Sequence, residues 1–316
     1  MKKIFFSFMA LAVLASCNKI EPLSVEQGDL IDFGSAFVDN STKAATDPSF
    51  GTKNPLSQFQ VWGTANNVAI FDGVAVTGTV GSGSVWTCTK KQYWINGVDY
   101  KFAAVVNGNV KTLAEGLPAT ISYEADGTSD LLYADTKNTE IKGMPTGQNT
   151  PVKFTFAHLL SKVKFTVNTT DVTEGYVYKV TGIKISNAYA SGTYTVADNE
   201  WEGVIPANNP GQSFSYIILN ATSVECDAEK LLIPTSEVKV SYTVALYYTG
   251  NGSEEQIWSQ SYTDVVAKKA DNTNVELEAA KSYNFNITLN VGEEIKFSVE
   301  EYAGWDKNGS QTGVTL

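Results

Sequence analysis

The only imidazole in the chain belongs to His158, in the stretch PVKFTFAHLLSKVKFTV, residues 151–167. A catalytic triad needs a base beside a nucleophile, and a zinc site needs several nitrogen or sulfur ligands. Around His158, however, apolar residues alternate with lysine and threonine, a pattern typical of half-buried strands. The pattern indicates a strand-end side chain with its ring nitrogen satisfied locally. We therefore expect no catalytic residue and no enzyme activity.

Two acidic stretches offer other chemistry. EADGTSD, Glu124–Asp130, has three carboxylates that a calcium ion could use, but it lacks the spacing of an EF-hand loop. Glu300 and Glu301 could act as a glycosidase pair, yet adjacent strand residues point to opposite faces of a sheet. The chain has no P-loop and no nucleophile elbow. We expect no metal and no cofactor.

Cys17 ends a stretch with chemistry of a different kind. Residues 1–17, MKKIFFSFMALAVLASC, begin with two lysines, continue with an apolar run too short to span a bilayer, and close on LASC. This stretch resembles a bacterial lipobox, which predicts a lipoprotein signal peptide over residues 1–16 and lipidation (diacylglyceryl and palmitate) of Cys17. The alternative is an ordinary signal peptide with a chance cysteine. Cys88 and Cys226 remain, either as a disulfide or as two buried small side chains.

Length and charge narrow the class of protein. The chain has 316 residues, enough for two domains, and 43% of them are hydrophobic. Its net charge is −11 and its sequence pI about 4.7, which argues against a nucleic-acid partner. All 23 basic residues are lysines. The chain therefore lacks the side chain that grips phosphate or carboxylate with two parallel hydrogen bonds.

Short alternating segments separated by turn residues run through the chain from Phe59 onward. NVAIFDGVAVTGTV predicts two short strands separated by an Asp72–Gly73 turn, and Asn96–Gly97 predicts another turn. Tyr283, Phe285, Ile287 and Leu289 alternate with polar residues, and no long amphipathic helix is evident. The pattern predicts an all-β fold of two β-sandwiches, over residues 44–167 and 168–316.

The order of these motifs carries a family resemblance. After the lipobox come F-x-V-x-G (Phe59–Gly63), W…YW…Y-x-F-x-A (Trp86–Ala103), F-x-F-x-H-L-L-S-K-V-K-F-x-V (Phe154–Val167), Y-x-F-x-I-x-L (Tyr283–Leu289) and I-x-F-x-V…W (Ile295–Trp305). This ordered set resembles the fimbrillin family of Bacteroidales, the subunits of type V pili. The resemblance implies two tandem transthyretin-like β-sandwich domains and a structural role in a fimbrium that supports adhesion.

The family also implies a processing step. Fimbrillins reach the cell outer membrane as surface lipoproteins, and a protease then removes an N-terminal propeptide that includes the first strand. In this chain the propeptide would be residues 17–43, cut between Lys43 and Ala44, with Lys53 as the second candidate. The removed strand would be Leu30–Val38, with Ile31, Phe33 and Phe37 filling a groove. A strand from another fimbrial subunit would then occupy that groove.

Two features leave the role within a fimbrium open. The family's cut usually follows a basic residue, often arginine, and this chain has no arginine. Either the protease accepts lysine, or the chain stays uncut and lipid-anchored and acts as an anchor. The tail after Trp305 is short, and only Val314 and Leu316 are candidates for a donor strand, so a tip subunit is as plausible as a stalk subunit. A host glycan or protein would be the adhesion partner. The alternative function is a surface lipoprotein that binds glycans and never polymerises.

Overall fold

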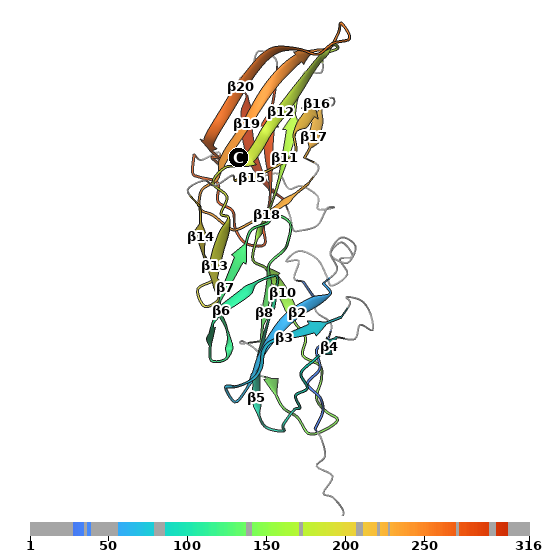
Figure 1. Ribbon diagram of the computed structural model, residues 1–316, viewed down its shortest axis with the longest axis vertical. Helices are drawn as coiled ribbons and strands as arrows, with labels where there is room; N and C mark the ends of the chain where they lie inside the picture. Colours follow the sequence, from blue (N-terminus) through green and yellow to red (C-terminus); the bar gives the residue numbers. More distant parts are fainter. Residues whose placement is uncertain are drawn as a thin grey trace, which may run out of the picture.

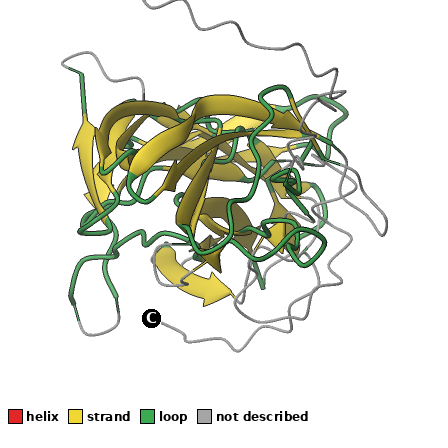
Figure 2. Cartoon of the chain, turned by 90° about the horizontal axis from the view of Figure 1, so that it is seen from below, coloured by secondary structure: helices red, strands yellow, loops and turns green. Residues whose placement is uncertain are grey.

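The computed structural model describes residues 28–34, 37–38, 56–78, 86–136, 141–170, 173–206, 211–219, 222–226, 228–269, 272–290 and 295–302. Throughout these residues the chain forms strands and loops, without a helix. The molecule is extended along one axis, with the early strands at one end and the late strands at the other (Figure 1). Seen along that axis, the strands stack as layers with loops at their margins (Figure 2). The all-β prediction is confirmed.

The N-terminal half is built around one sheet with the strand order β1-β10-β8-β5-β2-β3-β4, in which β9 also pairs with β5. Its strands are β1 (Phe37–Val38), β2 (Gln58–Ala65), β3 (Val68–Thr77), β4 (Thr87–Cys88), β5 (Asp99–Val106), β8 (Leu132–Asp135), β9 (Ile141–Lys142) and β10 (Thr155–His158). The alternating apolar residues of these strands meet in a core rich in phenylalanine and tryptophan.

One predicted turn in this sheet is wrong. The β2–β3 hairpin turns at Asn66 and Asn67, whose φ angles of 46° and 63° fit the mirror-image turn that suits twisted hairpins. Asp72–Gly73 lies inside the continuous strand β3, near an irregularity in its pairing with β2. Gly73, at φ 61°, lies against the Trp62 ring and marks a bulge. The Asn96–Gly97 turn is present as predicted.

The C-terminal half is a sandwich of two sheets. One sheet has the order β17-β11-β21-β22, with β18 also on β11, and the other has the order β15-β12-β19-β20, with β16 also on β12. Their strands are β11 (Ser161–Asn168), β12 (Tyr176–Ile185), β15 (Gln212–Ser213), β16 (Ile217–Leu219), β17 (Ser223–Glu225), β18 (Lys230–Leu232), β19 (Lys239–Tyr248), β20 (Glu255–Val266), β21 (Ser282–Thr288) and β22 (Lys296–Tyr302). Phe165, Val180, Val244 and Phe285 lie in the core between them.

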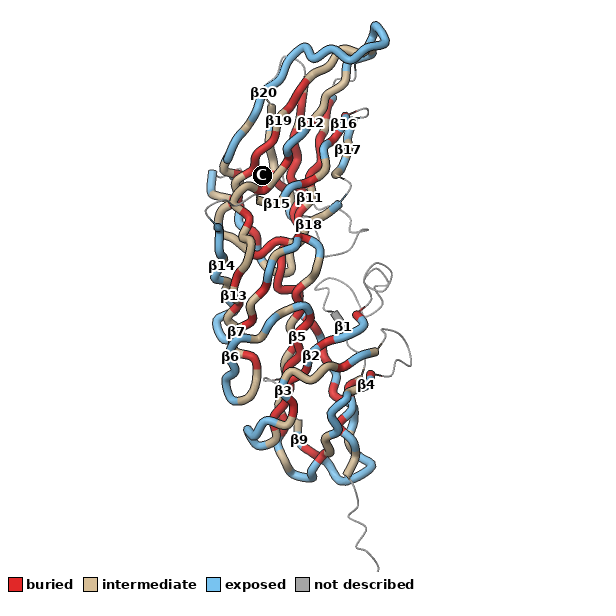
Figure 3. The backbone as a smooth tube through the Cα atoms, viewed as in Figure 1, coloured by how far each residue is buried: buried red, intermediate tan, exposed pale blue. Residues whose placement is uncertain are grey.

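A smaller sheet joins the two halves. It has the order β14-β13-β7-β6 and consists of β6 (Asn109–Ala114), β7 (Leu117–Glu124), β13 (Ser191–Thr195) and β14 (Glu200–Val204). A third apolar cluster, which includes Trp62, Ile121, Leu160 and Tyr194, lies at this junction. Figure 3 shows buried residues along the central strands, whereas β20 and β6 are mainly exposed.

The chain crosses from the first sheet to the second half within a few residues. β10 ends at His158 and pairs with β8, whereas β11 begins at Ser161 and pairs with β17, β18 and β21. The domain limits 44–167 and 168–316 stay a prediction. The strand pairing favours a division at Leu159–Leu160, because β11 makes its backbone hydrogen bonds with the C-terminal half.

Candidate functional site: the groove that holds the leading segment

The described residues before the first long strand, 28–34 and 37–38, are here called the leading segment. On one side it pairs antiparallel with residues next to β4, because Leu30 bridges Tyr93 and Phe33 bridges Trp86. On the other side Phe33 bridges Val152 in parallel, and β1 continues in parallel along β10. The strands β10 and β4 lie on opposite sides of this sheet in the strand order. The leading segment lies between β10 and the residues next to β4, and it thereby closes the sheet.

Backbone hydrogen bonds hold the leading segment on both sides. The Ile31 amide donates to the Gln92 carbonyl at 2.8 Å, and the Trp94 amide donates to the Asp29 carbonyl at 2.9 Å. Towards β10, the amide of Gly34 donates to the Val152 carbonyl, and the Val152 amide donates to the Asp32 carbonyl, both at 2.8 Å. The segment therefore acts as a strand with two neighbours.

The side chains of the leading segment alternate between core and solvent. Ile31 and Phe33 are 2% and 3% exposed, whereas Leu30 is 37% exposed and Asp32 is also exposed. Phe33 lies among four phenylalanine rings at centroid distances of 5.6 to 6.2 Å: Phe59, Phe71, Phe102 and Phe154. Burying each of the two apolar side chains contributes about 1.5–3 kcal/mol. Without the segment, this apolar surface would line an open groove.

A polar contact fixes the start of the leading segment. The Asp29 carboxylate accepts hydrogen bonds from the Gly147 amide at 2.8 and 2.9 Å and from the Asn149 side-chain amide at 2.8 Å. The Asn149 backbone amide adds a longer bond of 3.3 Å. These bonds, that of the Asn149 side chain foremost, hold the pKa of the Asp29 carboxyl below its usual value. No pattern of residues in the sequence points to this contact.

His158 is the last residue of β10, two positions after Phe156, which pairs with Val38 of β1. Its side chain is 1% exposed, and its Nδ1 lies 2.5 Å from Oδ2 of Asp130. Because the imidazole is buried, a substrate in solution does not reach it. The contact ties β10 to the residues before β8.

The acidic loop Glu124–Asp130 is organised by its own hydrogen bonds. The Asp126 carboxylate accepts bonds from the amides of Thr128 and Ser129, both at 2.7 Å, and from the Ser129 hydroxyl. Burial opposes ionisation of Asp126, but these bonds outweigh it and lower its pKa to about 2. Within the described part of the chain, no three His, Cys, Asp or Glu side chains gather as a metal site would require.

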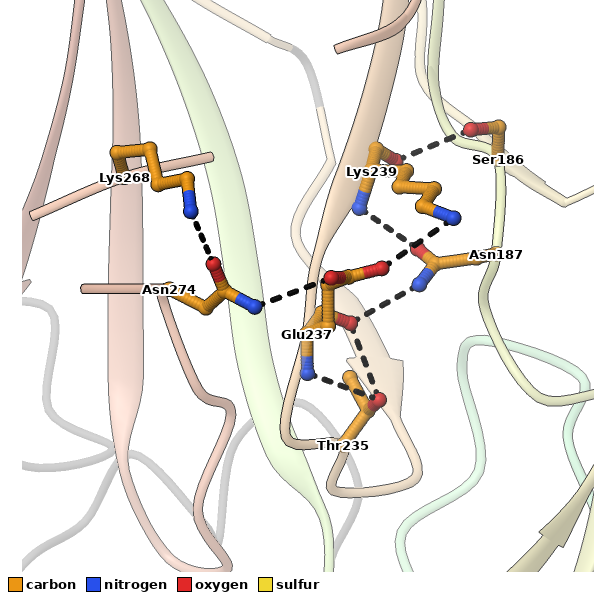
Figure 4. A network of polar contacts seen from close by, with 7 residues as sticks. All are labelled: Ser186, Asn187, Thr235, Glu237, Lys239, Lys268 and Asn274. Atoms are coloured by element: carbon orange, nitrogen blue, oxygen red, sulfur yellow. Dashed lines mark hydrogen bonds and ion pairs between the residues drawn. The ribbon is translucent and has the colours of Figure 1, made fainter. Parts of the chain in front are cut away.

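A polar cluster joins residues at the end of β12 and the start of β19 to the loop after β20 (Figure 4). Glu237 is its centre: its carboxylate accepts from the Asn274 side chain at 3.0 Å and pairs with the Lys239 ammonium at 3.2 Å. Its carbonyl accepts from Asn187 at 2.9 Å, and Asn187 in turn accepts from the Lys239 amide. The groups bind one another, so the cluster holds loops together and presents no activated nucleophile.

The other predicted site residues lie either outside the described part of the chain or in β1. Cys17, Lys43, Ala44, Val314 and Leu316 lie outside the described residues, as does the signal peptide. β1 gives Phe37 a backbone partner, Thr155. The described part of the chain contains no helix long and apolar enough to cross a membrane.

The two remaining cysteines are thiols. Cys88 packs against the core of the N-terminal half and Cys226 against that of the C-terminal half, so no disulfide joins them. Burial raises the pKa of the Cys88 thiol. Of the two alternatives left open by the sequence, the structure favours small packed side chains.

A match to a protein family shows which proteins this chain is related to. The model of the family described as fimbrillin-like matches residues 42–301. The chain belongs to the fimbrillin-like family. The leading segment of this fimbrillin-like chain lies before the matched residues, although it forms part of the first sheet.

One solved structure supports the fold of this fimbrillin-like chain. A candidate cell adhesion protein from Bacteroides ovatus is 16% identical, with a TM-score of 0.51, and the match covers 88% of this chain and 98% of that one. A similar protein from Bacteroides uniformis is 16% identical over 78% and 91%, with a TM-score of 0.47. The fimbrial anchor protein Mfa2 from Porphyromonas gingivalis is 13% identical over 88% and 97%, with a TM-score of 0.34. No curated protein sequence matches this chain.

Proposed function

We propose that this chain is a subunit of a cell-surface fimbrium that assembles by strand exchange and supports adhesion. One observation carries the proposal: the leading segment closes the first sheet from both sides and buries Ile31 and Phe33 in its core. If this segment is removed, an apolar groove with unpaired backbone groups on both walls opens. Such a groove is a template for a strand from another subunit. Membership of the fimbrillin-like family supports the fimbrial role.

The steps that we propose before assembly are those that the family resemblance implies. Lipidation of Cys17 attaches the exported chain to the outer membrane. Cleavage between Lys43 and Ala44 then separates the leading segment from the rest of the chain. The cut ends the covalent link that keeps the segment close to its groove, so a strand from a second subunit can replace it. Val314 and Leu316 are the candidate groove-filling residues of this chain when it donates a strand.

N-terminal sequencing of the form found on the cell surface tests the processing step. An N-terminus at Ala44 supports trimming and assembly, and SDS-resistant ladders after limited trypsin treatment of the purified chain would support polymerisation. A lipidated Cys17 at the start of all surface copies would instead support an anchor. A chain that stays monomeric after trimming and binds to a glycan array would refute assembly and favour the glycan-binding alternative.

A further inference from the structure

We propose that the loop Met144–Asn149 is a carboxylate receptor that sets the register of the strand in the groove and selects incoming strands that carry an acidic residue at one position. The selection of incoming strands rests on the strand exchange proposed above. In the present structure the receptor holds the Asp29 carboxylate of the leading segment. After exchange it would hold an aspartate or glutamate of another subunit.

The receptor loop is organised by bonds that do not involve Asp29. The Met144 amide donates to the Asn149 side-chain oxygen at 2.8 Å, and the Asn149 side-chain nitrogen donates back to the Met144 carbonyl at 2.9 Å. The Gln148 amide donates to the Pro145 carbonyl at 3.0 Å. These bonds do not depend on the leading segment, so its removal leaves the donors of Gly147 and Asn149 pointing at an empty carboxylate position.

The donors in this loop favour an anion. The two closest are a backbone N–H and a side-chain amide N–H, which donate and cannot accept in this arrangement. Hydrogen bonds to an ionised acceptor are about twice as strong as those between neutral groups. A carboxylate is therefore bound more tightly than an amide or a hydroxyl, and an ammonium group is rejected.

The position of the carboxylate relative to the apolar anchors gives the register. Asp29 precedes Ile31 by two residues and Phe33 by four, so the three side chains have the same parity along the strand. A slip by one residue would move the carboxylate about 3.3 Å and turn the apolar side chains to the solvent face. An incoming strand that satisfies both the receptor and the core therefore needs an acidic residue two positions before its first buried apolar residue.

Asp32 provides a matched control within the same segment. It carries the same charge, and its backbone carbonyl accepts a hydrogen bond from the Val152 amide. Its side chain is exposed. Replacing Asp32 by asparagine changes the net charge of the segment as Asp29→Asn does, without touching the receptor.

The first experiment measures hydrogen exchange in the full, uncut chain. In the Asp29→Asn variant we expect the amides of Gly147 and Asn149 to exchange roughly tenfold faster, because the charge-assisted bonds are lost. The Asp32→Asn variant should exchange at the wild-type rate. Equal exchange rates at Gly147 and Asn149 in the two variants would overturn the proposal that this loop is a carboxylate receptor.

The second experiment measures strand exchange. The chain is trimmed with trypsin and mixed with a fluorescent peptide of residues 28–38, with its Asp29→Asn form, or with its Asp32→Asn form. We expect roughly tenfold weaker binding of the Asp29→Asn peptide and little change for the Asp32→Asn peptide. Equal binding of all three peptides would overturn selection by the receptor but leave strand exchange intact. Failure of all three to bind would contradict strand exchange itself, and hydrogen exchange would still decide whether the loop holds Asp29.

Discussion

The contribution of the leading segment to the core can be measured by replacing Phe33 with alanine in the full chain. Phe33 is 3% exposed and lies among four phenylalanine rings. Removal of its ring leaves a cavity that these rings fill only in part, because they belong to strands held by backbone hydrogen bonds. A buried phenylalanine in such a place costs about 3–5 kcal/mol of unfolding free energy when it is truncated to alanine.

Leu30→Ala is the matched control for this measurement. Leu30 is an apolar residue of the same segment, but it is 37% exposed and faces away from the core. Its truncation should cost no more than about 1 kcal/mol. The assay is urea unfolding followed by tryptophan fluorescence, since Trp86 and Trp94 lie in the same core as Phe33. If Phe33→Ala loses no more stability than Leu30→Ala, the leading segment is not part of the core and the groove argument fails.

Three further predictions concern other parts of the chain. The pKa of Asp126 is lowered to about 2 in the folded chain from a usual 3.8, so its contribution to stability is complete above that usual value and is lost as the pH falls towards 2. Acid titrations should show a difference between wild type and Asp126→Asn at pH 7 that vanishes near pH 2; a constant difference would contradict the assignment. Gly143→Ala should destabilise the chain by about 1–3 kcal/mol, because the added carbon would lie 2.1 Å from the Ile95 carbonyl oxygen; an unchanged thermal midpoint would show that the loop relaxes. In unfolding buffer without reductant, Cys88 and Cys226 should both react with a thiol reagent, and a mass shift of two hydrogens on reduction would reveal a disulfide instead.

The alternation of apolar residues indicated which apolar side chains of the leading segment and of β21 are buried. Ile31 and Phe33 are both buried, while Leu30 before them and Asp32 between them face solvent. The period of two also identified β21, because a strand places successive side chains on opposite faces wherever it pairs.

What the pattern could not predict is which strands become neighbours. Asp72–Gly73 has the composition of a turn, yet the pairing of β3 with β2 accommodates it as a bulge inside one strand. β11 continues the pattern of β10, yet it pairs in the C-terminal half. Local residue types limit the backbone conformation of a segment, whereas its partner depends on the competition among all edges in the folded chain.

The sequence by itself therefore determined that the chain is all-β, and which side of each strand is apolar, because burial leaves a local periodic record. Only the tertiary structure decided that the leading segment closes the first sheet and that the Met144–Asn149 loop binds the Asp29 carboxylate. The two partners of that contact are 120 positions apart in the chain. A contact of this kind forms only when the sheet brings the two stretches together, so no spacing of residues in the sequence marks it.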